Sequence, residues 1–226
     1  MNNYKLLESF LDDWNQDVRC NITDRPFIKD GIINPEKFSK QKIKVLFISN
    51  ESNIDGGKFD SNVTYDTRKC FNAYLKDSYD SWPGKLRERV SSLYQVVIQD
   101  YSMEPYKYVD CFSFMNLNKT GGGKKIDERL TDFCQKYSDR IKTEISLIAP
   151  DLIIWLGCNT FDNTKIRKEY VGIVSNKGLY KFNDIPVIRM WHTSYYQCRG
   201  KRLGVFENRT IDKIAYKLRK ELETIE

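Results

Sequence analysis

Short apolar runs alternate with longer amphipathic stretches along this chain. The runs are long enough for buried β-strands and rich in β-branched or aromatic residues, and they lie at residues 43–48, 108–115, 152–157 and 185–191. Around them, apolar residues recur every three or four positions, which predicts helices at residues 4–18, 66–77, 83–99, 126–148 and 207–224. Strands that alternate with helices favour a parallel sheet with helices on its faces.

The pattern therefore predicts an α/β protein with three layers, α/β/α, around a central, mostly parallel four-stranded sheet. The helix and proline-bearing loop of residues 1–40 are expected to pack on a core domain at residues 41–226. A short helix and a hairpin near residues 178–185 are expected before the fourth strand.

Composition narrows the class of protein. The chain has 226 residues, of which 40% are apolar and 30% charged, as in soluble globular proteins. No apolar run approaches the ~20 residues of a membrane span, and the first residues lack the apolar core of a secretory signal, so a cytoplasmic protein is expected. With one histidine and no Cys-x-x-Cys pair among six cysteines, no metal or other cofactor is expected. The net charge of +6 permits a polyanionic partner.

Polar residues whose side chains suit catalysis or ligand binding follow the predicted strands. Asn50 and Glu51 follow the first strand, Asn116 ends the second, and the only histidine, His192, follows the fourth. Carboxyl ends of parallel strands meet at one edge of a sheet, where ligands usually bind. There a carboxylate can activate water, an amide can read a base edge, and a histidine can stabilise a leaving group. Taken singly, each also fits a structural role, as a loop acid, a turn amide or a half-buried histidine.

Four segments in order are similar to motifs of the uracil-DNA glycosylase superfamily, over about residues 40–222. They are Ser-Asn-Glu-Ser-Asn at 49–53, Asn-Leu-Asn-Lys at 116–119, the Ala-Pro-Asp, apolar strand and Leu-Gly passage at 149–157, and His-Thr-Ser-Tyr at 192–195. The first motif lacks the family's glycine and proline, threonine replaces the proline after the histidine, and the iron–sulfur cysteines are missing. The chain thus resembles a divergent member.

The resemblance implies a role for each site residue. Asn50 and Glu51 would hold and activate water, and His192 would donate a hydrogen bond to the departing base. Asn116 would read the pairing edge of that base, with Tyr65, or alternatively Phe59, stacked upon it. The residues expected to contact DNA, through phosphates or the gap left by the flipped base, are Lys119, Lys124, Ser194, Tyr195, Tyr196, Arg199 and Arg202.

The expected function is hydrolysis of the N-glycosidic bond of uracil or a related modified base in DNA, leaving an abasic site. A monomer is expected to act on single- or double-stranded DNA, without a membrane. Two alternatives stay open: a catalytically silent module that binds nucleic acid, and an N-glycosidase of free nucleosides or nucleotides. A nuclease would need paired metal-binding carboxylates beside a lysine, for which the sequence offers no convincing set.

Overall fold

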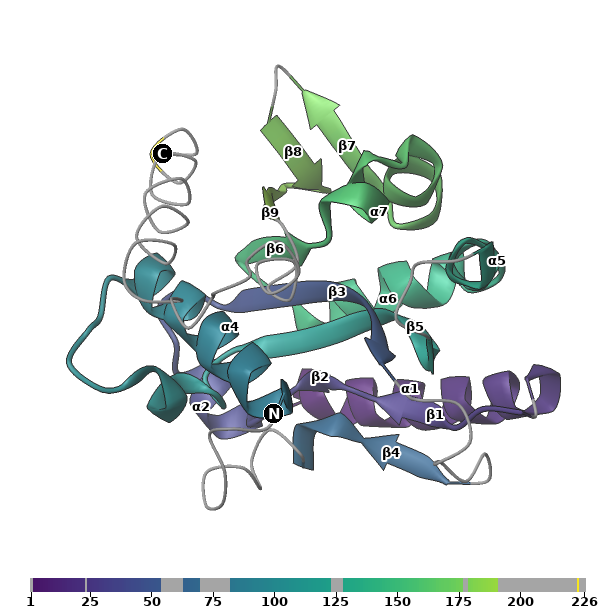
Figure 1. Ribbon diagram of the computed structural model, residues 1–226, viewed down its shortest axis with the longest axis horizontal. Coiled ribbons are helices and arrows are strands. Elements are labelled where there is room, and N and C mark those ends of the chain that lie inside the picture. The colour runs from purple at the N-terminus through teal and green to yellow at the C-terminus, as the bar shows by residue number, and fades with distance from the viewer. Residues whose placement is uncertain are drawn as a thin grey trace, which may run out of the picture.

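The computed structural model describes residues 2–22, 24–53, 63–69, 82–122, 128–176, 179–190 and 223 (Figure 1). Its helices are α1 (Asn2–Asn21), α2 (Pro35–Ser39), α4 (Trp82–Ile98), α5 (Glu128–Lys136), α6 (Ser138–Ile148) and α7 (Cys158–Asp162), with a 3₁₀ turn at Pro105–Tyr108 and a π-helical segment at Lys165–Tyr170. Its strands are β1 (Phe27–Lys29), β2 (Gly31–Ile32), β3 (Val45–Asn53), β4 (Thr64–Asp66), β5 (Ser113–Gly122), β6 (Leu152–Leu156), β7 (Ile173–Asn176), β8 (Leu179–Phe182) and β9 (Ile185–Met190). None of the helices within these ranges is long and apolar enough to cross a membrane.

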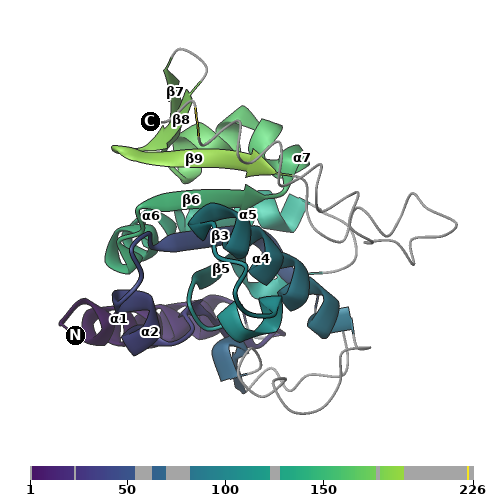
Figure 2. The same cartoon turned by 90° about the vertical axis from the view of Figure 1, so that its left-hand side faces the viewer.

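The main sheet has seven strands in the order β2-β5-β3-β6-β9-β8-β7. The four strands that correspond to the predicted ones, β5, β3, β6 and β9, lie next to one another and run parallel (Figure 2). β2 is antiparallel at one edge, and β8 and β7 continue the sheet as an antiparallel pair at the other. The expected count of four strands was therefore wrong, because short antiparallel strands extend the parallel centre on both sides.

Helices cover both faces of the sheet, which gives three layers. On one face, alternate residues such as Ile48 and Trp155 pack against α1, α5 and α6. On the other face, their neighbours Phe47 and Ile154 pack against α4. This strict alternation along β3 and β6 is what a strand buried on both faces requires.

The N-terminal segment is packed into the larger of the two cores. Trp14 of α1 is fully buried and lies 6.2 Å, between ring centroids, from Phe133, with which it stacks. β2 follows α1 and pairs with β5 through Gly31 and Ile32. Residues before the first parallel strand thus contribute both a helix and an edge strand to the fold.

The second parallel strand lies further along the chain than expected. Residues 108–115 were predicted as a strand, but Tyr108 ends a 3₁₀ turn, the Cys111 N–H donates to the Tyr108 carbonyl over 2.9 Å, and β5 begins only at Ser113. The apolar residues Tyr108 and Phe112 are buried against α4 as a turn, so hydrophobicity alone did not identify a strand here. Consequently Asn116 lies inside β5 rather than at its end.

The predicted helix at residues 126–148 is divided at Tyr137 into α5 and α6. Tyr137 has φ −110° and ψ 24°, outside the helical region, and its ring packs 4.7 Å from the ring of Phe133. The Tyr137 N–H still donates to the Phe133 carbonyl, and the Tyr137 carbonyl accepts from the Ile141 N–H. The inward apolar face therefore continues across the break.

Candidate functional site

One row of paired residues crosses the four parallel strands near their carboxyl ends. Ser49 of β3 is in register with Asn116 of β5 on one side and with Leu156 of β6 on the other. Leu156 is in turn paired with Met190, the last residue of β9. The candidate residues on β3 and β5 and the end of β9 therefore belong to the same edge of the sheet. This edge, with Ser49, Asn50, Asn116, Asn118 and Gly157, is called the carboxyl-edge site below.

Asn50 occupies the carboxyl-edge site as a buried side chain with an unused acceptor. It is 8% exposed, and its Oδ1 has no hydrogen-bond partner in the described part of the chain. The side chain lies against Gly157, where an added Cβ would come within 2.7 Å of Oδ1. The Gly157 N–H donates to the Met190 carbonyl over 2.9 Å, so this glycine is held in place. A buried acceptor without a protein partner can accept from a water or from a ligand donor.

A β-bulge interrupts the pairing of β3 with β5 beside Asn50. Glu51 is in register with Asn118, but Asn53 is in register with Gly122, so β5 carries additional residues. Asn118 Oδ1 accepts from the backbone N–H and the hydroxyl of Thr120, over 2.9 and 2.8 Å, which stabilises the bulge. Bulges are frequent next to active sites because they redirect strand residues. The Glu51 side chain lies outside the described structure.

Asn116 is held by an aspartate from the N-terminal segment. Asp30 Oδ2 accepts from the backbone N–H of Asn116 over 2.8 Å and from its Nδ2 over 3.0 Å. Asn116 is only 3% exposed. Successive side chains of a strand point to opposite faces of the sheet. Asn116 therefore lies with Phe114 on the face covered by α4, whereas Asn50 lies with Ile48 on the face covered by α1. The two amides therefore approach the carboxyl-edge site from opposite faces of the sheet.

Lys119 was expected to contact a DNA phosphate, and the structure contradicts this. Its side chain is fully buried, and Nζ donates to Asp30 Oδ1 and to Glu144 Oε1, the latter over 2.8 Å. Nζ also lies 5.5 Å from the centroid of the Trp14 ring. Lys119, Asp30 and Glu144 are called the buried lysine cluster below. An ammonium enclosed in this way cannot reach solvent, so the cluster is structural rather than a phosphate-binding site.

The three charges of the buried lysine cluster balance only when one carboxyl is protonated. Burial raises the pKa of Glu144 to about 8, and Lys119 opposes this shift only in part. Burial by itself lowers the pKa of Lys119, but the carboxyls of Asp30 and Glu144 outweigh it and hold that pKa above its ordinary value. Near neutral pH the neutral form of Glu144 therefore lies beside a positive Lys119.

Tyr65, the preferred stacking residue, lies on the flank of the fold. It is half-buried in β4, in register with Ile28 of β1 in a separate two-stranded sheet. Arg68 ties this region to α1, because its guanidinium bonds both carboxylate oxygens of Glu8 as well as Asp66. β1 in turn lies beside β5, so two strands separate Tyr65 from β3.

Several expected site residues lie outside the described residues, and the structure gives them no position. They are His192, Phe59, Lys124, Ser194, Tyr195, Tyr196, Arg199 and Arg202. The assignment of these residues stays a prediction from the sequence. Of the catalytic and base-binding set, the structure places the side chains of Asn50, Asn116 and Tyr65 and brings the first two to one edge of the sheet.

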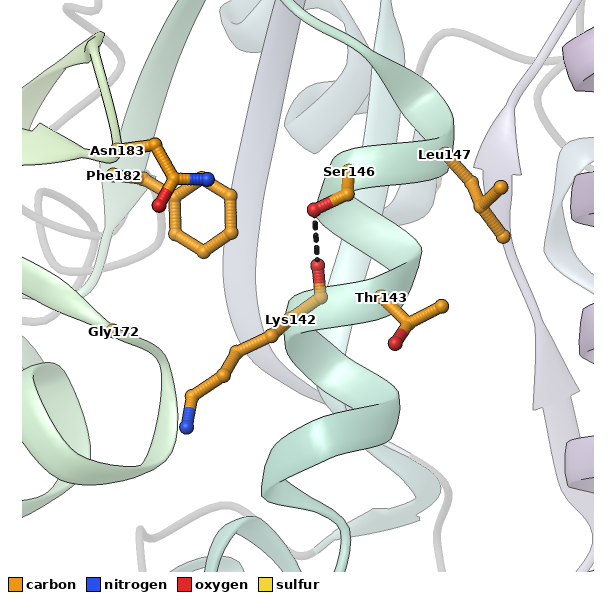
Figure 3. A pocket seen from close by; sticks show the side chains of 7 residues that line it. All are labelled: Lys142, Thr143, Ser146, Leu147, Gly172, Phe182 and Asn183. Carbon is orange, nitrogen blue, oxygen red and sulfur yellow. Dashed lines mark hydrogen bonds between the residues drawn. The ribbon is translucent and has the colours of Figure 1, made fainter.

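A shallow hollow of about 360 Å³ lies elsewhere on the molecule, between α6 and the turn that joins β8 to β9 (Figure 3). Lys142, Ser146 and Asn183 contribute polar groups to it, and Phe182 an aromatic ring. The C-terminal part of α6 and the start of β9 both lie where the parallel strands begin. This hollow is thus at the opposite end of the sheet from the carboxyl-edge site and contains none of its residues.

The structure adds Asp30, Glu144 and Gly157 to the residues that shape the site. Glu144 could have been noticed in the sequence, because it stands on the inward face of its helix between Ile141 and Ile148. A glutamate in an apolar stripe requires a buried partner. Asp30 gave a weaker signal, as one acid within the apolar segment at residues 27–33. Nothing local in the sequence indicated that Gly157 would contact Asn50.

Within the described ranges, no group of three or more histidine, cysteine, aspartate or glutamate side chains is arranged to hold a metal ion. No protein-family model matches the chain, and no curated protein is significantly similar to it. The inference of function therefore depends on the geometry of the carboxyl-edge site and on the resemblance of its motifs.

Proposed function

We propose that the protein is a DNA glycosylase that hydrolyses the N-glycosidic bond of uracil or a related modified base. The observation that carries this proposal is the row formed by Asn116, Ser49, Leu156 and Met190 across four adjacent parallel strands. The row brings the first three segments that resemble glycosylase motifs to one edge of the sheet, where β9 also ends. In open α/β sheets this edge is where ligands bind.

The residues at this edge supply the functions that the reaction needs. Breaking the bond places positive charge on the sugar and negative charge on the departing base. A carboxylate at Glu51 would orient water and favour the sugar cation, and the buried acceptor of Asn50 would help to hold that water. A neutral His192 would donate to the base oxygen, a contact worth about 3 kcal/mol. Asn116 would recognise the pairing edge of the base.

Base release from labelled oligonucleotides tests this proposal. Single- and double-stranded substrates carrying uracil, hypoxanthine, xanthine or 5-hydroxymethyluracil are incubated with the protein, and abasic sites are then cleaved with alkali. We expect strand breaks with the wild type and at least about a 100-fold loss in both His192→Ala and Glu51→Gln. Glu36→Gln, on the exposed side of α2, serves as the matched control and should keep full activity. Breaks that persist in both site variants would show that the site is placed wrongly.

A silent nucleic-acid-binding module is the second candidate, and one observation favours it. Asn116, the residue expected to read the base, is only 3% exposed in this structure. A binding module would retain salt-sensitive DNA affinity without releasing a base, and Glu51→Gln would leave that affinity unchanged. An N-glycosidase of free nucleosides would differ from both, because long DNA would neither bind to it nor inhibit it in a salt-dependent way.

A further inference from the structure

Two arginines from different elements bind the last turn of α7. Arg167, in the π-helical segment, donates from Nη1 to the Phe161 carbonyl over 3.1 Å. Arg189, in β9, donates from Nη2 to Asp162 Oδ2 over 2.5 Å. Because Phe161 and Asp162 are consecutive residues, both guanidinium groups lie at the end of α7. Arg167 and Arg189 are called the arginine pair below.

The arginine pair lies beside the carboxyl-edge site. α7 follows β6 through Gly157 alone, and Figure 2 shows it next to the carboxyl ends of β6 and β9. Arg189 immediately precedes Met190, the β9 residue of the paired row. Since side chains alternate along a strand, Arg189 lies with Val187 on the α1 side of the sheet, as Asn50 does. The arginine pair and the buried acceptor of Asn50 therefore share one end and one side of the sheet.

Each arginine of the pair has a donor without an acceptor. Arg167 Nε and Arg189 Nε have no hydrogen-bond partner among the described residues. A guanidinium can only donate, so each of these N–H groups needs an acceptor from a water or an anion. Two positive groups with unused donors favour an anion with several oxygens, because Nε and a terminal nitrogen of one guanidinium can bind two oxygens side by side.

The guanidinium of Arg167 is fixed in place by aromatic rings. Its central carbon lies 5.3 Å from the centroid of the Phe161 ring and 5.2 Å from that of the Tyr180 ring. The segment that carries Arg167 is π-helical, with the Val171 N–H donating to the Ile166 carbonyl over 2.9 Å. Such segments are rare and occur frequently at functional sites. A donor that is already fixed loses little freedom when a ligand binds.

Asp162 is the carboxylate that a bound anion would replace. Within the described ranges it is the only acidic side chain that bonds to either arginine of the pair. The side chains of Arg189 and Asp162 are 37% and 52% exposed, so a ligand can reach them from solvent. An ion pair this exposed contributes little to stability, so exchanging Asp162 for another anion costs little.

We propose that the arginine pair is a phosphate-binding subsite of the carboxyl-edge site. A phosphate group would accept from both guanidinium groups and would displace Asp162 from Arg189. The inference rests on the proposed function for the source of that phosphate, the backbone of DNA next to the released base. The phosphate of a free nucleotide has the same chemistry, and the experiment separates the two sources. The subsite would supply the phosphate contact that the buried Lys119 cannot make.

Binding, rather than base release, tests the subsite. Fluorescence anisotropy gives the affinity for a labelled single-stranded oligonucleotide between about 50 and 200 mM salt, and calorimetry gives the affinity for deoxyuridine monophosphate. We expect Arg167→Gln and Arg189→Gln each to weaken DNA binding at least about tenfold and to reduce the salt slope by about one. Arg140→Gln is the matched control and should change neither. Arg140 is also ion-paired and lies over the ring of Phe10, but its acidic partners belong to α1.

Asp162→Asn separates a phosphate subsite from an ion pair that only stabilises the fold. Removing this carboxylate frees Arg189 and removes a negative charge that repels phosphate, so DNA should bind at least about threefold more tightly. If the ion pair served only to hold α7, Asp162→Asn and Arg189→Gln would change the affinity in the same direction. Both side chains are partly exposed, so these two variants decide the question even if Arg167→Gln fails to fold.

Each result supports or overturns the inference. Opposite changes in Asp162→Asn and Arg189→Gln support it. If only DNA binding changes, the subsite holds a backbone phosphate, and if binding of deoxyuridine monophosphate changes likewise, it holds the phosphate of a nucleotide. Equal affinities in all variants, changes of the same sign, or a wild type that binds neither probe overturn it. A protein that shows the expected pattern but releases no base contradicts only the glycosylase proposal.

Discussion

The buried lysine cluster and the carboxyl-edge site lie on neighbouring strands and differ in whether the central side chain of each has charged partners. In the cluster, the Lys119 ammonium meets two carboxyls, Asp30 and Glu144, and is sealed from solvent. In the site, Asn50 on the adjacent strand keeps a buried acceptor with no described partner. Closed networks of the first kind maintain a fold, whereas open groups of the second kind are available to a ligand. Residue type alone would not separate these roles.

The largest loss of stability should come from removing the lysine of the buried lysine cluster. Lys119→Met leaves Asp30 buried without its counter-charge, and we expect the free energy of unfolding to fall by about 3–5 kcal/mol. Urea denaturation followed by circular dichroism measures this change. Adding Asp30→Asn should recover much of the loss, since no buried charge remains. Lys40→Met removes an exposed ion pair with Glu36 and should leave the urea midpoint unchanged.

The second effect is a dependence of stability on pH that originates in the cluster. With the pKa of Glu144 raised from 4.5 to about 8, the folded state holds a proton that the unfolded chain releases. The contribution of Glu144 is therefore full below pH 4.5 and is lost as the pH rises through about 8. The fall should be at most about 1.4 kcal/mol per pH unit.

Glu144→Gln tests the origin of that slope, because glutamine resembles the protonated side chain at every pH. Thermal unfolding between pH 5 and pH 8.5 should show a flatter profile for this variant than for the wild type. Equal slopes in the two proteins would place the titrating group elsewhere. The pKa values of Glu8 and Asp66 are affected first by burial, which raises them, but contacts with Arg68 outweigh it and lower both. Their stabilisation is lost only as the pH falls through those lowered values, so they do not account for a slope above pH 5.

Filling the space next to Asn50 should reduce stability less than breaking the buried lysine cluster does, but should reduce base release more. In Gly157→Ala, the new methyl group would come within 2.7 Å of Asn50 Oδ1, so the amide must turn. We expect a loss of about 1–3 kcal/mol, together with at least a tenfold loss of base release. A double-mutant cycle with Asn50→Ala measures the coupling, and purely additive losses would contradict the contact.

The smallest loss of stability is expected for a substitution in the β-bulge. Thr120→Val keeps the side-chain shape but removes the hydroxyl that donates to Asn118 over 2.8 Å. The backbone N–H of Thr120 still satisfies the same oxygen, so the cost should be about 0.5–1.5 kcal/mol. Chemical denaturation measures it, and a reduced rate of base release would show that the bulge positions Glu51.

The central sheet could be predicted because its strands are buried on both faces and read as continuous apolar runs. β6 overlaps the predicted run at residues 152–157 closely. β3 begins two residues after the start of the run predicted at residues 43–48 and continues to Asn53, so Asn50 and Glu51 lie within the strand rather than after it. The apolar run at residues 108–115 was wrongly predicted to be a strand over its whole length, because a buried turn and a buried strand can have the same composition. β2, with two residues, is too short to leave a pattern of its own.

The site was less predictable than the sheet, because its most important contacts join residues that are far apart in the sequence. Lys119 follows Asn116 closely and looked like a phosphate ligand, yet Asp30 and Glu144, 89 and 25 residues away, enclose it. The contact between Asn50 and Gly157 likewise depends on the order of the strands. The roles assigned to Glu51 and His192 stay predictions that the base-release experiment will decide.

The position of Asp30 also bears on how this protein can be shortened or recombined. Asp30 joins α1 and β1 to β2, and its side chain is the counter-ion of a lysine deep in the sheet domain. Cutting the chain after residue 40 would remove an edge strand and this counter-ion together, and would leave Glu144 as the one remaining carboxyl of the cluster beside Lys119. The first forty residues therefore do not form a detachable module, because they carry part of the sheet and part of the charge balance around Lys119.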